Sequence, residues 1–471
     1  MKRREFLKSM AVVGALPLLP ACFSAKAYRA NGKVRLAAIG VGAQAWHDLK
    51  QFAKNPDICE IVALCDTDIG AKHTLEALKT YPNLPRFQDF RKMFDAMDGR
   101  IDAVLVGTPD FSHFPCTMEA IRRGIPVYVE KPLAHTFEEC ELLMQAEKKY
   151  GVICQMGNQG HSGNNYFQFK EYVEKGVFDL SKLTKLVAHM NNPRRWHKWN
   201  GNVTKFPTGE ALPKDLDWDT WLATAQYHAY SKDYVQGEWR SWFDFGNGCL
   251  GDWGAHTFDT MHRFFRLGLP TKVTIKDVEG WNPYVFPMQD TLVYDFAADG
   301  NRPAIKLEWY EGVKNLPTFC KDYKYLVGGA IPPSGAGTSA KKGQLMPGKY
   351  FELSDGTAWE GASHGNPIVR CGESNEVPEY PYMDLGFEAP ELCHYRSFLR
   401  AVRGEEKTKS PFSVSGPLAE VFCLGCIAQR LNRSFAFDPV KKQVVGDEVA
   451  NALLKGAKGT PRKGWEEFYR V

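Results

Sequence analysis

The chain has 471 residues, of which 44% are hydrophobic and 24% are charged, the balance of an ordinary soluble globular protein with two or three domains. The formal net charge of +4 is small for this length, and without a basic stripe or a nucleic-acid motif it excludes nucleic acid as an expected partner. Twelve cysteines are too sparse for a disulfide framework. The single C-x-x-C, at Cys423 and Cys426 in an apolar stretch, predicts a buried helix face in preference to a redox pair or half a zinc site.

The N-terminus has the features of an export signal. The segment R-R-E-F-L-K from Arg3 to Lys8 precedes an apolar run from Met10 to Leu19, which is too short for a comfortable membrane span. The paired arginines resemble the twin-arginine signal, so we expect export to the periplasm by that machinery. Cys22 follows L-P-A and predicts a lipid anchor, the alternative being cleavage near Ala27 with Cys22 as an ordinary residue.

A short apolar run, Val34 to Ile39, suits a buried parallel strand and leads directly into G-V-G-A-Q-A. This G-x-G-x-x-A pattern, followed by helical spacing, is typical of a dinucleotide-binding turn. Gly40 allows the tight turn, Gly42 lets the backbone approach a pyrophosphate, and Ala45 lets the helix pack on the strand. The N–H groups that open the helix face the phosphate charge. The cofactor contacts predicted for this turn are Gly40, Gly42, Ala43 and Gln44.

The next predicted strand, Glu60 to Cys65, ends at Asp66, the expected position of an acid that bonds the ribose 2′-hydroxyl. A carboxylate at this position repels a 2′-phosphate, so the sequence favours NAD over NADP as the cofactor. Two alternatives stay open, because Asp66 could cap a helix and Asp68 could take either role.

Strands and helices continue to alternate as far as about residue 157, which predicts a parallel, doubly wound sheet. Thr136 and Glu139 form a capping box that predicts a helix running to Tyr150. The other predicted elements are strands at Ile101–Val106, Val127–Val129 and Val152–Gln155 and a helix at Phe114–Arg123.

Three short motifs follow one another along the chain: G-T-P at Gly107–Pro109 with His113, E-K-P at Glu130–Pro132, and G-C-L-G-D-W-G-A-H at Gly248–His256. From Val34 to about Phe437 they resemble the glucose–fructose oxidoreductase, inositol dehydrogenase and MocA superfamily. The resemblance implies an α/β protein with an N-terminal Rossmann domain and a C-terminal α+β domain whose open, mainly antiparallel sheet covers the nicotinamide. It also implies further cofactor contacts at Thr108, Pro109, His113, Glu130 and Lys131. Asn158 follows the last predicted Rossmann strand, where the chain should cross the cofactor, and is expected to contact it as well.

We therefore expect four parts in the chain. These are a signal peptide (1–30), an NAD-binding Rossmann domain (31–157), a substrate-binding domain (158–437) and a C-terminal extension that packs on the domains (438–471). The stretch from Gly328 to Gly348 is rich in Gly, Pro, Ser and Lys and predicts a surface loop. The other elements predicted for the second half are strands at Leu183–Met190, Lys272–Val278, Thr291–Ala297 and Ala304–Tyr310 and helices at about Pro390–Val402 and Pro417–Arg430.

Oxidation of an alcohol requires transfer of a hydride to the cofactor and removal of a proton from the hydroxyl, and the protein supplies the base. Lys131 can hydrogen-bond the reacting oxygen, although a surface lysine before a proline turn is the alternative. Asp252 and His256 are four residues apart, so they share one face if Gly251 opens a helix. In line with the resemblance, we expect His256 as base or proton relay, Lys131 as its partner on the oxygen, and Asp252 as substrate anchor.

Two other interpretations of this segment stay open. His256 could be a core histidine and Asp252 a helix cap. The spacing of Asp252, His256, Asp259 and His262 also suits metal ligands, but the hydride chemistry that the resemblance implies needs no metal, so no metal is expected.

Aromatic and arginine residues suggest a carbohydrate pocket. Two segments, Pro193–Trp199 and Glu238–Trp242, combine flat rings with fork-shaped donors, and Trp196 and Arg240 are the substrate contacts expected from them, besides Asp252 and His256. Trp218 and Trp221 are expected to be packing residues in a short helix.

The leading hypothesis is an NAD-dependent oxidoreductase acting on a hydroxyl of a sugar, polyol or glycoside. An exported enzyme would have to retain its cofactor, since little free nicotinamide cofactor exists outside the cytoplasm. The alternatives are an NAD-dependent glycosidase that works by transient oxidation, and a non-catalytic sugar- or cofactor-binding lipoprotein. The resemblance also implies a homo-oligomer, because open sheets of this family commonly pair between subunits.

Overall fold

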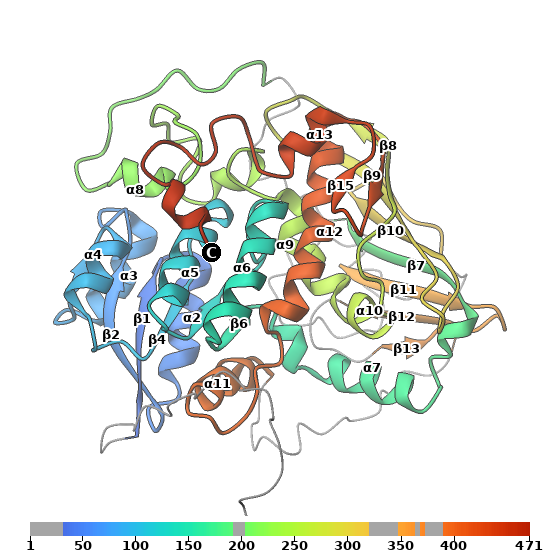
Figure 1. The fold of residues 1–471 in the computed structure, drawn as a ribbon, viewed down its shortest axis with the longest axis horizontal. Coiled ribbons are helices and arrows are strands. Elements are labelled where there is room, and N and C mark those ends of the chain that lie inside the picture. The colour runs from blue at the N-terminus through green and yellow to red at the C-terminus, as the bar shows by residue number, and fades with distance from the viewer. Residues whose placement is uncertain (1–31, 192–202, 320–346, 363–367, 373–389) are drawn as a thin grey trace, which may run out of the picture.

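A six-stranded sheet and a nine-stranded sheet lie side by side in the computed structural model, and helix α12 runs between them (Figure 1). The structure describes residues 32–191, 203–319, 347–362, 368–372 and 390–471. The predicted export signal, Cys22, Trp196 and nearly all of the predicted loop at Gly328–Gly348 lie outside these residues.

The N-terminal sheet is parallel throughout and has the order β3-β2-β1-β4-β5-β6, so the predicted doubly wound Rossmann fold is confirmed. Its strands are β1 Val34–Ile39, β2 Cys59–Cys65, β3 Arg86–Phe87, β4 Ala103–Val106, β5 Val127–Val129 and β6 Cys154–Met156. Its helices are α2 Ala43–Ala53, α3 Lys72–Thr80, α4 Phe90–Ala96, α5 His113–Arg122 and α6 Phe137–Tyr150.

Helix α6 shows how closely local sequence can determine an element. Thr136 Oγ1 accepts a hydrogen bond from the Glu139 N–H at 3.2 Å, and Glu139 Oε2 accepts one from the Thr136 N–H at 3.0 Å. The predicted capping box is therefore present, and the helix ends at Tyr150 because Gly151 takes a left-handed conformation with φ 62°.

The C-terminal sheet has the order β13-β12-β11-β7-β10-β9-β8-β14-β15 and is antiparallel except where β7 pairs with β10. The prediction of a mainly antiparallel second sheet is confirmed, and the four strands expected in it differ from those observed by at most two residues at either end. The strands are β7 Leu183–Met190, β8 Lys272–Glu279, β9 Gln289–Phe296, β10 Ile305–Glu311, β11 Gly348–Leu353, β12 Ala358–Ala362, β13 Val369–Arg370, β14 Phe435–Asp438 and β15 Gln443–Val444.

The remaining helices are α7 Asn164–Glu174, α8 Trp218–Leu222, α9 Gly248–Thr257, α10 Asp259–Phe264, α11 Pro390–Val402, α12 Phe412–Leu431 and α13 Glu448–Leu453. Helix α12 begins at Phe412, earlier than the predicted start at Pro417, so Pro417 lies inside it. The early start depends on a residue from another helix, because Glu147 of α6 accepts hydrogen bonds from the N–H groups of Phe412 and Ser413 at 3.0 and 2.9 Å.

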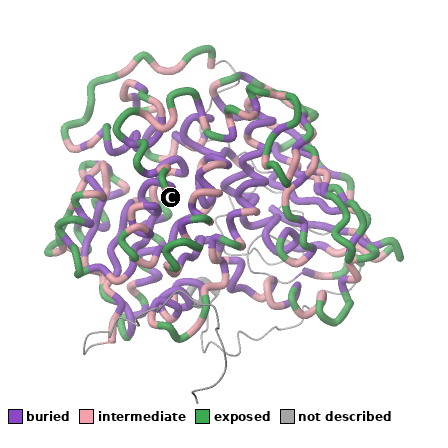
Figure 2. Tube along the Cα trace, viewed as in Figure 1, coloured by how far each residue is buried: buried purple, intermediate pink, exposed green. Residues whose placement is uncertain are grey.

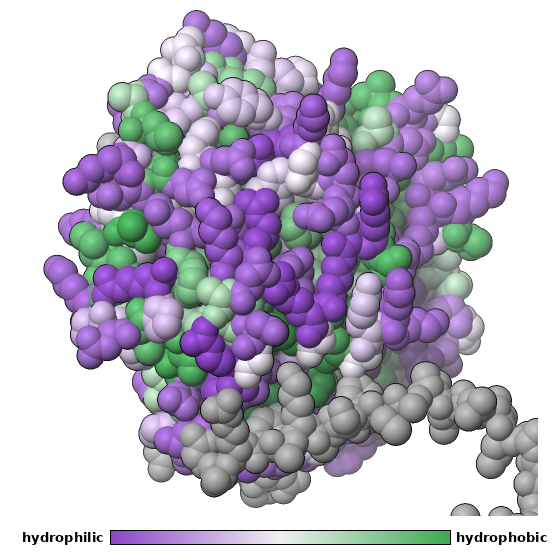
Figure 3. Space-filling view, turned by 60° about the vertical axis from the view of Figure 1, so that its left-hand side comes forward, coloured by the Kyte–Doolittle hydropathy of each residue, from purple (hydrophilic) through white to green (hydrophobic). Residues whose placement is uncertain are grey.

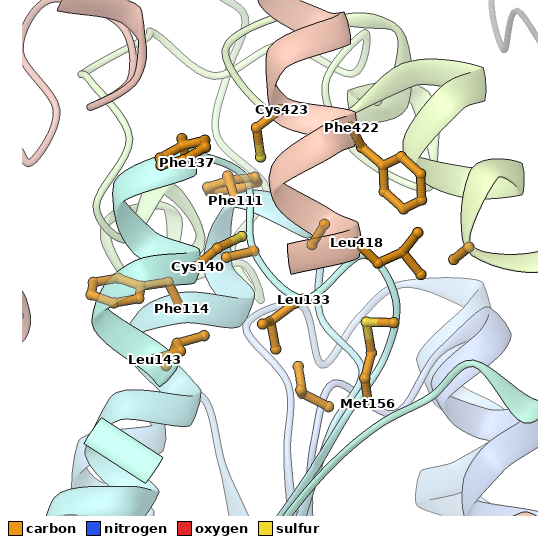
Figure 4. Close-up of a cluster of buried hydrophobic side chains, with 14 of the residues drawn as sticks. Phe111, Phe114, Leu133, Phe137, Cys140, Leu143, Met156, Leu418, Phe422 and Cys423 are labelled. Atoms are coloured by element: carbon orange, nitrogen blue, oxygen red, sulfur yellow. The ribbon is translucent and has the colours of Figure 1, made fainter. Parts of the chain in front are cut away.

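Helix α12 is a core element that joins the two halves of the molecule. It packs against α6 and α9, and Figure 4 shows Leu418 and Cys423 on the side of the Rossmann half, whereas Phe422 points towards the helices of the second half, where it meets Phe258. Cys423 is buried, as predicted for the C-x-x-C segment. Among the described residues α12 is also the one helix long and apolar enough to cross a membrane, but 78% of its apolar window is buried inside the structure.

Two late segments return to the Rossmann half (Figure 1). Helix α11 packs on α2, where Phe398 and Leu399 are buried in the same cluster as Phe52. Near the C-terminus, Trp465 and Phe468 pack against Phe90 in tilted arrangements, with ring centroids 6.1 and 6.0 Å from that of Phe90. Buried residues extend through both halves of the molecule (Figure 2). Hydrophilic residues predominate on the face shown in Figure 3.

Candidate functional site

A large pocket lies at the carboxyl ends of the parallel strands, where ligands of doubly wound sheets bind. Its volume is about 1060 Å³. Loops after β1, β2, β4, β5 and β6 form one wall, and α9 with the segment from Thr220 to Arg240 forms the other. The pocket therefore belongs to both halves of the molecule. Most predicted site residues line it: Gly40, Gly42, Ala43, Gln44, Asp66, Thr108, Pro109, His113, Glu130, Lys131, Arg240, Asp252 and His256.

The glycine turn has the geometry that its sequence predicts. Gly40 has φ +80°, and a Cβ there would lie 2.6 Å from the carbonyl oxygen of Gly107, so only glycine fits without strain. Ala45 packs directly on Gly107, since a Cβ added to Gly107 would lie 2.5 Å from the Ala45 Cβ. The turn thus brings the start of α2 close to β4, with the N–H groups of the helix start at the pocket.

Asp66 follows β2 and is held by the backbone. Its Oδ2 accepts from the Val41 N–H and its Oδ1 from the Asp68 N–H, both at 3.0 Å. Burial raises the pKa of this carboxyl, while the two N–H donors favour the ionised form. Helix α3 begins only at Lys72, so Asp66 does not cap it, and each carboxylate oxygen keeps acceptor capacity for a ribose hydroxyl.

His113 joins the two loops at the inner end of the pocket. Its Nε2 lies 2.8 Å from the carbonyl oxygen of Thr108, and its Nδ1 lies 2.7 Å from that of Pro132. Burial lowers the pKa of His113 to about 4, so the ring is neutral near pH 7 and donates to one of these carbonyls at a time. The histidine thus fixes the spacing of the G-T-P and E-K-P segments.

Lys131, Asp252 and His256 meet in the same pocket. Lys131 Nζ donates to Asp252 Oδ1 at 2.7 Å and to the Asp252 carbonyl oxygen at 3.1 Å. Asp252 and His256 lie on one face of α9, and their side chains are buried. Because α9 begins at Gly248, Asp252 lies within the helix and is not its cap.

Arg240 lies beside this group. Its Nη1 is 3.5 Å from Asp252 Oδ1 and 3.9 Å from Asp110 Oδ1, and its guanidinium stacks 4.2 Å from the ring centroid of Trp239. Burial raises the pKa of Asp110, which also accepts from the Asn247 N–H at 3.0 Å. Two cations and two carboxyl groups therefore alternate along one wall, next to an aromatic ring.

The side chain of Asn158 bonds a buried carboxylate. Its amide donates to Asp259 Oδ2 at 3.1 Å, Asp259 also bonds His161 at 2.5 Å, and Asn158 is not among the residues that line the pocket. Its role as a cofactor contact stays a prediction. The neighbouring Gln159 lines the pocket instead. The buried carboxylate of Asp259 attracts the amide away from the pocket, and the sequence order alone could not reveal this.

Sequence reasoning missed several pocket residues. Asp110 follows the predicted contact Pro109, which signalled it weakly. Trp239 lies within the predicted segment Glu238–Trp242, although it was not named as a contact. His73 and Tyr395 had no local signal: His73 lies against Gly42 from the start of α3, and Tyr395 comes from the distant α11. Trp218 and Trp221 stack at 4.4 Å and are buried, as expected, and Trp221 also lines the pocket.

Three of the four side chains considered as metal ligands bond separate partners. Asp252 pairs with Lys131, Asp259 with His161, and His262 with the carbonyl oxygen of Gly268 at 2.9 Å. Among the residues that the structure describes, no group of three or more such side chains could hold a metal ion.

The pocket has unused hydrogen-bonding capacity that suits a dinucleotide. His73 Nδ1, beside the glycine turn, and Thr108 Oγ1, in the G-T-P loop, are both buried without a hydrogen-bond partner within the described residues. Such orphaned polar atoms are costly unless a ligand or water satisfies them. Phosphate and ribose oxygens of a nicotinamide dinucleotide would do so, which means that the residues present fit this cofactor.

Comparison with known families agrees with this geometry. The profile described as "Oxidoreductase family, NAD-binding Rossmann fold" matches residues 34–158, and that described as "Oxidoreductase family, C-terminal alpha/beta domain" matches residues 163–279. Together the two profiles cover about half of the chain.

Curated relatives match a shorter part. A "Glycosyl hydrolase family 109 protein" of Stenotrophomonas maltophilia is 33% identical over 216 residues, 44% of this chain and 46% of the relative. An "Alpha-N-acetylgalactosaminidase" of Shewanella oneidensis is 27% identical over 197 residues, 37% of this chain and 42% of the relative. The chain thus spans about half the length, or less, of these relatives.

Solved structures share the fold at low identity. The WlbA dehydrogenase of Bordetella pertussis, solved in complex with NADH and UDP-GlcNAcA, superposes with a TM-score of 0.57 at 13% identity. The superposition covers 86% of this chain and 98% of that one. The similarity therefore extends over both halves of the molecule, and at this identity it shows the fold alone.

Proposed function

Because the chain belongs to the Gfo/Idh/MocA oxidoreductase family, with its NAD-binding Rossmann fold, we propose that it transfers a hydride between a tightly held NAD and a hydroxyl of a sugar, polyol or glycoside. One observation carries this proposal: the Lys131–Asp252 ion pair and His256 share a single pocket with the glycine turn. A nucleotide-binding wall and a set of proton-transfer groups thus face the same space.

The cofactor would be held by the N–H groups at the start of α2 and by Asp66. His73 Nδ1 and Thr108 Oγ1, which are buried without a hydrogen-bond partner within the described residues, would also bond it. The Asp66 carboxylate supports NAD in preference to NADP, because a 2′-phosphate would meet a like charge. When bound, the cofactor supplies the acceptor or donor of hydride.

The chain's own residues supply the proton chemistry. Lys131 is held by Asp252 with its ammonium at the pocket, where it can donate a hydrogen bond to the reacting oxygen and stabilise negative charge that develops there. His256 lies one turn further along α9 and takes the hydroxyl proton during oxidation or returns it during reduction. Trp239 and Arg240 supply an apolar face and donors for sugar hydroxyls.

The experiment is a screen of mono- and disaccharides against the purified protein while the absorbance or fluorescence of bound reduced cofactor is followed. A sugar that changes the redox state of the bound cofactor supports the proposal. If the protein retains cofactor but transfers hydride to or from no carbohydrate tested, a cofactor-binding protein without this activity is the better account.

A second function is favoured by the similarity to glycosyl hydrolase family 109 proteins. The same groups could serve a glycosidase that oxidises a sugar carbon transiently, eliminates the leaving group, adds water to the resulting double bond and reduces the carbonyl back to the alcohol. Release of a chromogenic leaving group without net change in the cofactor's redox state would select this reaction over plain dehydrogenation.

The proposed setting is the periplasm, reached by the twin-arginine machinery, with Cys22 as a lipid anchor and the protein as a homo-oligomer. Since that machinery carries folded proteins, the cofactor would cross the membrane already bound. Mass spectrometry of protein purified from the periplasm and then denatured tests this, and a preparation that releases no nicotinamide contradicts it.

A further inference from the structure

A hydrogen-bonded network lies under the cofactor pocket and joins three distant segments of the chain. Tyr395 of α11 donates from its hydroxyl to Asp48 Oδ1 of α2 at 2.6 Å. Gln159, after β6, donates from Nε2 to the Tyr395 hydroxyl oxygen at 3.2 Å and to Glu130 Oε1 at 3.1 Å. An amide nitrogen has two hydrogens, so Gln159 serves both acceptors in full.

The network contains two carboxyl groups with almost no access to water. Asp48 is fully buried, and Glu130 is 4% exposed. Burial, together with the like charge of its neighbour, raises the pKa of Glu130 well above the ordinary value, and burial raises that of Asp48. The hydroxyl and amide donors of Tyr395 and Gln159 help to compensate the charge left on this pair, together with Gln44, whose Nε2 donates to Asp48 Oδ1 at 2.9 Å.

Packing fixes the Tyr395 ring. It stacks on Tyr128 with ring centroids 5.5 Å apart and meets Phe52 edge-on at 5.1 Å. The position of the Tyr395 hydroxyl relative to Asp48 is therefore set by the packing of the ring. This hydrogen bond depends on the packing of α11 against α2. Glu130 is also closely fitted, because a Cβ on Gly157 would lie 2.3 Å from its Oε1.

The position of Glu130 matters for the site because the next residue is Lys131. Glu130 Oε2 accepts from the Lys131 N–H at 3.3 Å, and Glu130, Gln159 and Tyr395 all line the pocket. A shift of the Gln159 amide would therefore move both the pocket wall and the segment that carries Lys131.

We propose that Tyr395 is a positioning residue for cofactor binding: its hydroxyl holds Gln159, and through it Glu130, in the geometry that retains the nicotinamide dinucleotide. This inference rests on the proposed function. It assigns to α11, outside the Rossmann sequence, the task of holding one wall of the Rossmann pocket, so cofactor retention depends on the docking of a segment from the second half of the chain.

The test compares Tyr395→Phe with Tyr469→Phe in the purified holoenzyme. Both substitutions keep the ring and remove a hydroxyl that bonds a buried carboxylate, since Tyr469 donates to Glu139 Oε1 at 2.5 Å, but Tyr469 lies outside the pocket lining. The readout is the rate at which bound reduced cofactor is released after dilution, followed by its fluorescence. Tyr395→Phe is expected to raise this rate about tenfold, the factor for one lost hydrogen bond to a charged group. Tyr469→Phe is expected to lower the melting temperature similarly but to leave the release rate unchanged.

A release rate unchanged by Tyr395→Phe, or raised equally by Tyr469→Phe, overturns the inference. A double-mutant cycle with Gln159→Leu gives a second criterion: if the two residues act through one network, the combined effect is smaller than the product of the single effects, and independent effects contradict the proposal. A wild-type protein that carries no nicotinamide would instead contradict the proposed function, so the two failures are distinguishable.

Discussion

Replacing Lys131 by methionine tests the centre of the proposed site most directly. The substitution keeps most of the length of the side chain but removes the ammonium that bonds Asp252 Oδ1 at 2.7 Å. The pair is largely shielded from water, with side-chain exposures of 10% and 7%. The variant therefore leaves a buried carboxylate whose Oδ1 still has Arg240 Nη1 at 3.5 Å.

The expected effects on rate and on stability differ in size and in cause. Breaking a buried ion pair by removing one partner costs about 3–5 kcal/mol, and because Arg240 still faces the carboxylate we expect a loss near the lower end of this range. Removing one positioned donor to an oxygen that develops negative charge lowers turnover by about 10²- to 10³-fold, so turnover should fall by a factor in that range.

A double substitution, Lys131→Met with Asp252→Asn, separates the two effects. Removing the negative charge of Asp252 should restore much of the free energy of unfolding, but turnover should stay low because the ammonium is still missing. Denaturant unfolding measures the first quantity, and the change in absorbance of reduced cofactor with an active sugar measures the second. Lys175→Met, which breaks the exposed pair with Glu171, is the control and should change neither. If Lys131→Met keeps the wild-type turnover, the assignment of Lys131 to the reacting oxygen is refuted.

Three further outcomes are expected. Asp66→Asn should weaken the preference for NAD over NADP by about tenfold or more, measured as the ratio of their dissociation constants, because the charge that repels a 2′-phosphate is lost; an unchanged ratio would contradict the role given to Asp66. Gly40→Ala should abolish cofactor retention and lower the free energy of unfolding by about 1–2 kcal/mol or more. The reason is that φ is +80° at this residue and the new Cβ would lie 2.6 Å from the Gly107 carbonyl oxygen. Cofactor retained at the wild-type level would refute the turn geometry. Asp290 faces Glu311 across β9 and β10, and burial raises the pKa of Asp290 to about 7, above its value of about 4 in the unfolded chain, so stability should fall as the pH rises from about 4 to about 7. Asp290→Asn should weaken this dependence, and because burial also raises the pKa of Glu311, part of it should remain; parallel stability–pH curves of the variant and the wild type would contradict the shift.

Most of the fold was predictable where local sequence carries its own physical cause. The strand at Val34–Ile39 and the turn after it follow from an apolar run and two glycines, and the helix at Phe137–Tyr150 follows from its capping box and Gly151. Helix α12 departed from its predicted start because Glu147 of α6 binds its first N–H groups, an interaction that no pattern around Pro417 encodes.

The candidate site divides in the same way. By itself the sequence determined which residue types follow each strand, and parallel strands gather those residues at one edge; Gly40, Asp66 and Lys131 could therefore be named from their positions. Only the tertiary structure decided that Asn158 turns towards Asp259 and that Tyr395 reaches under the pocket from α11. In both cases a buried polar group bonds a partner from a segment that is distant in the sequence. Which partner it bonds is decided by how the segments pack, so the local sequence does not reveal it.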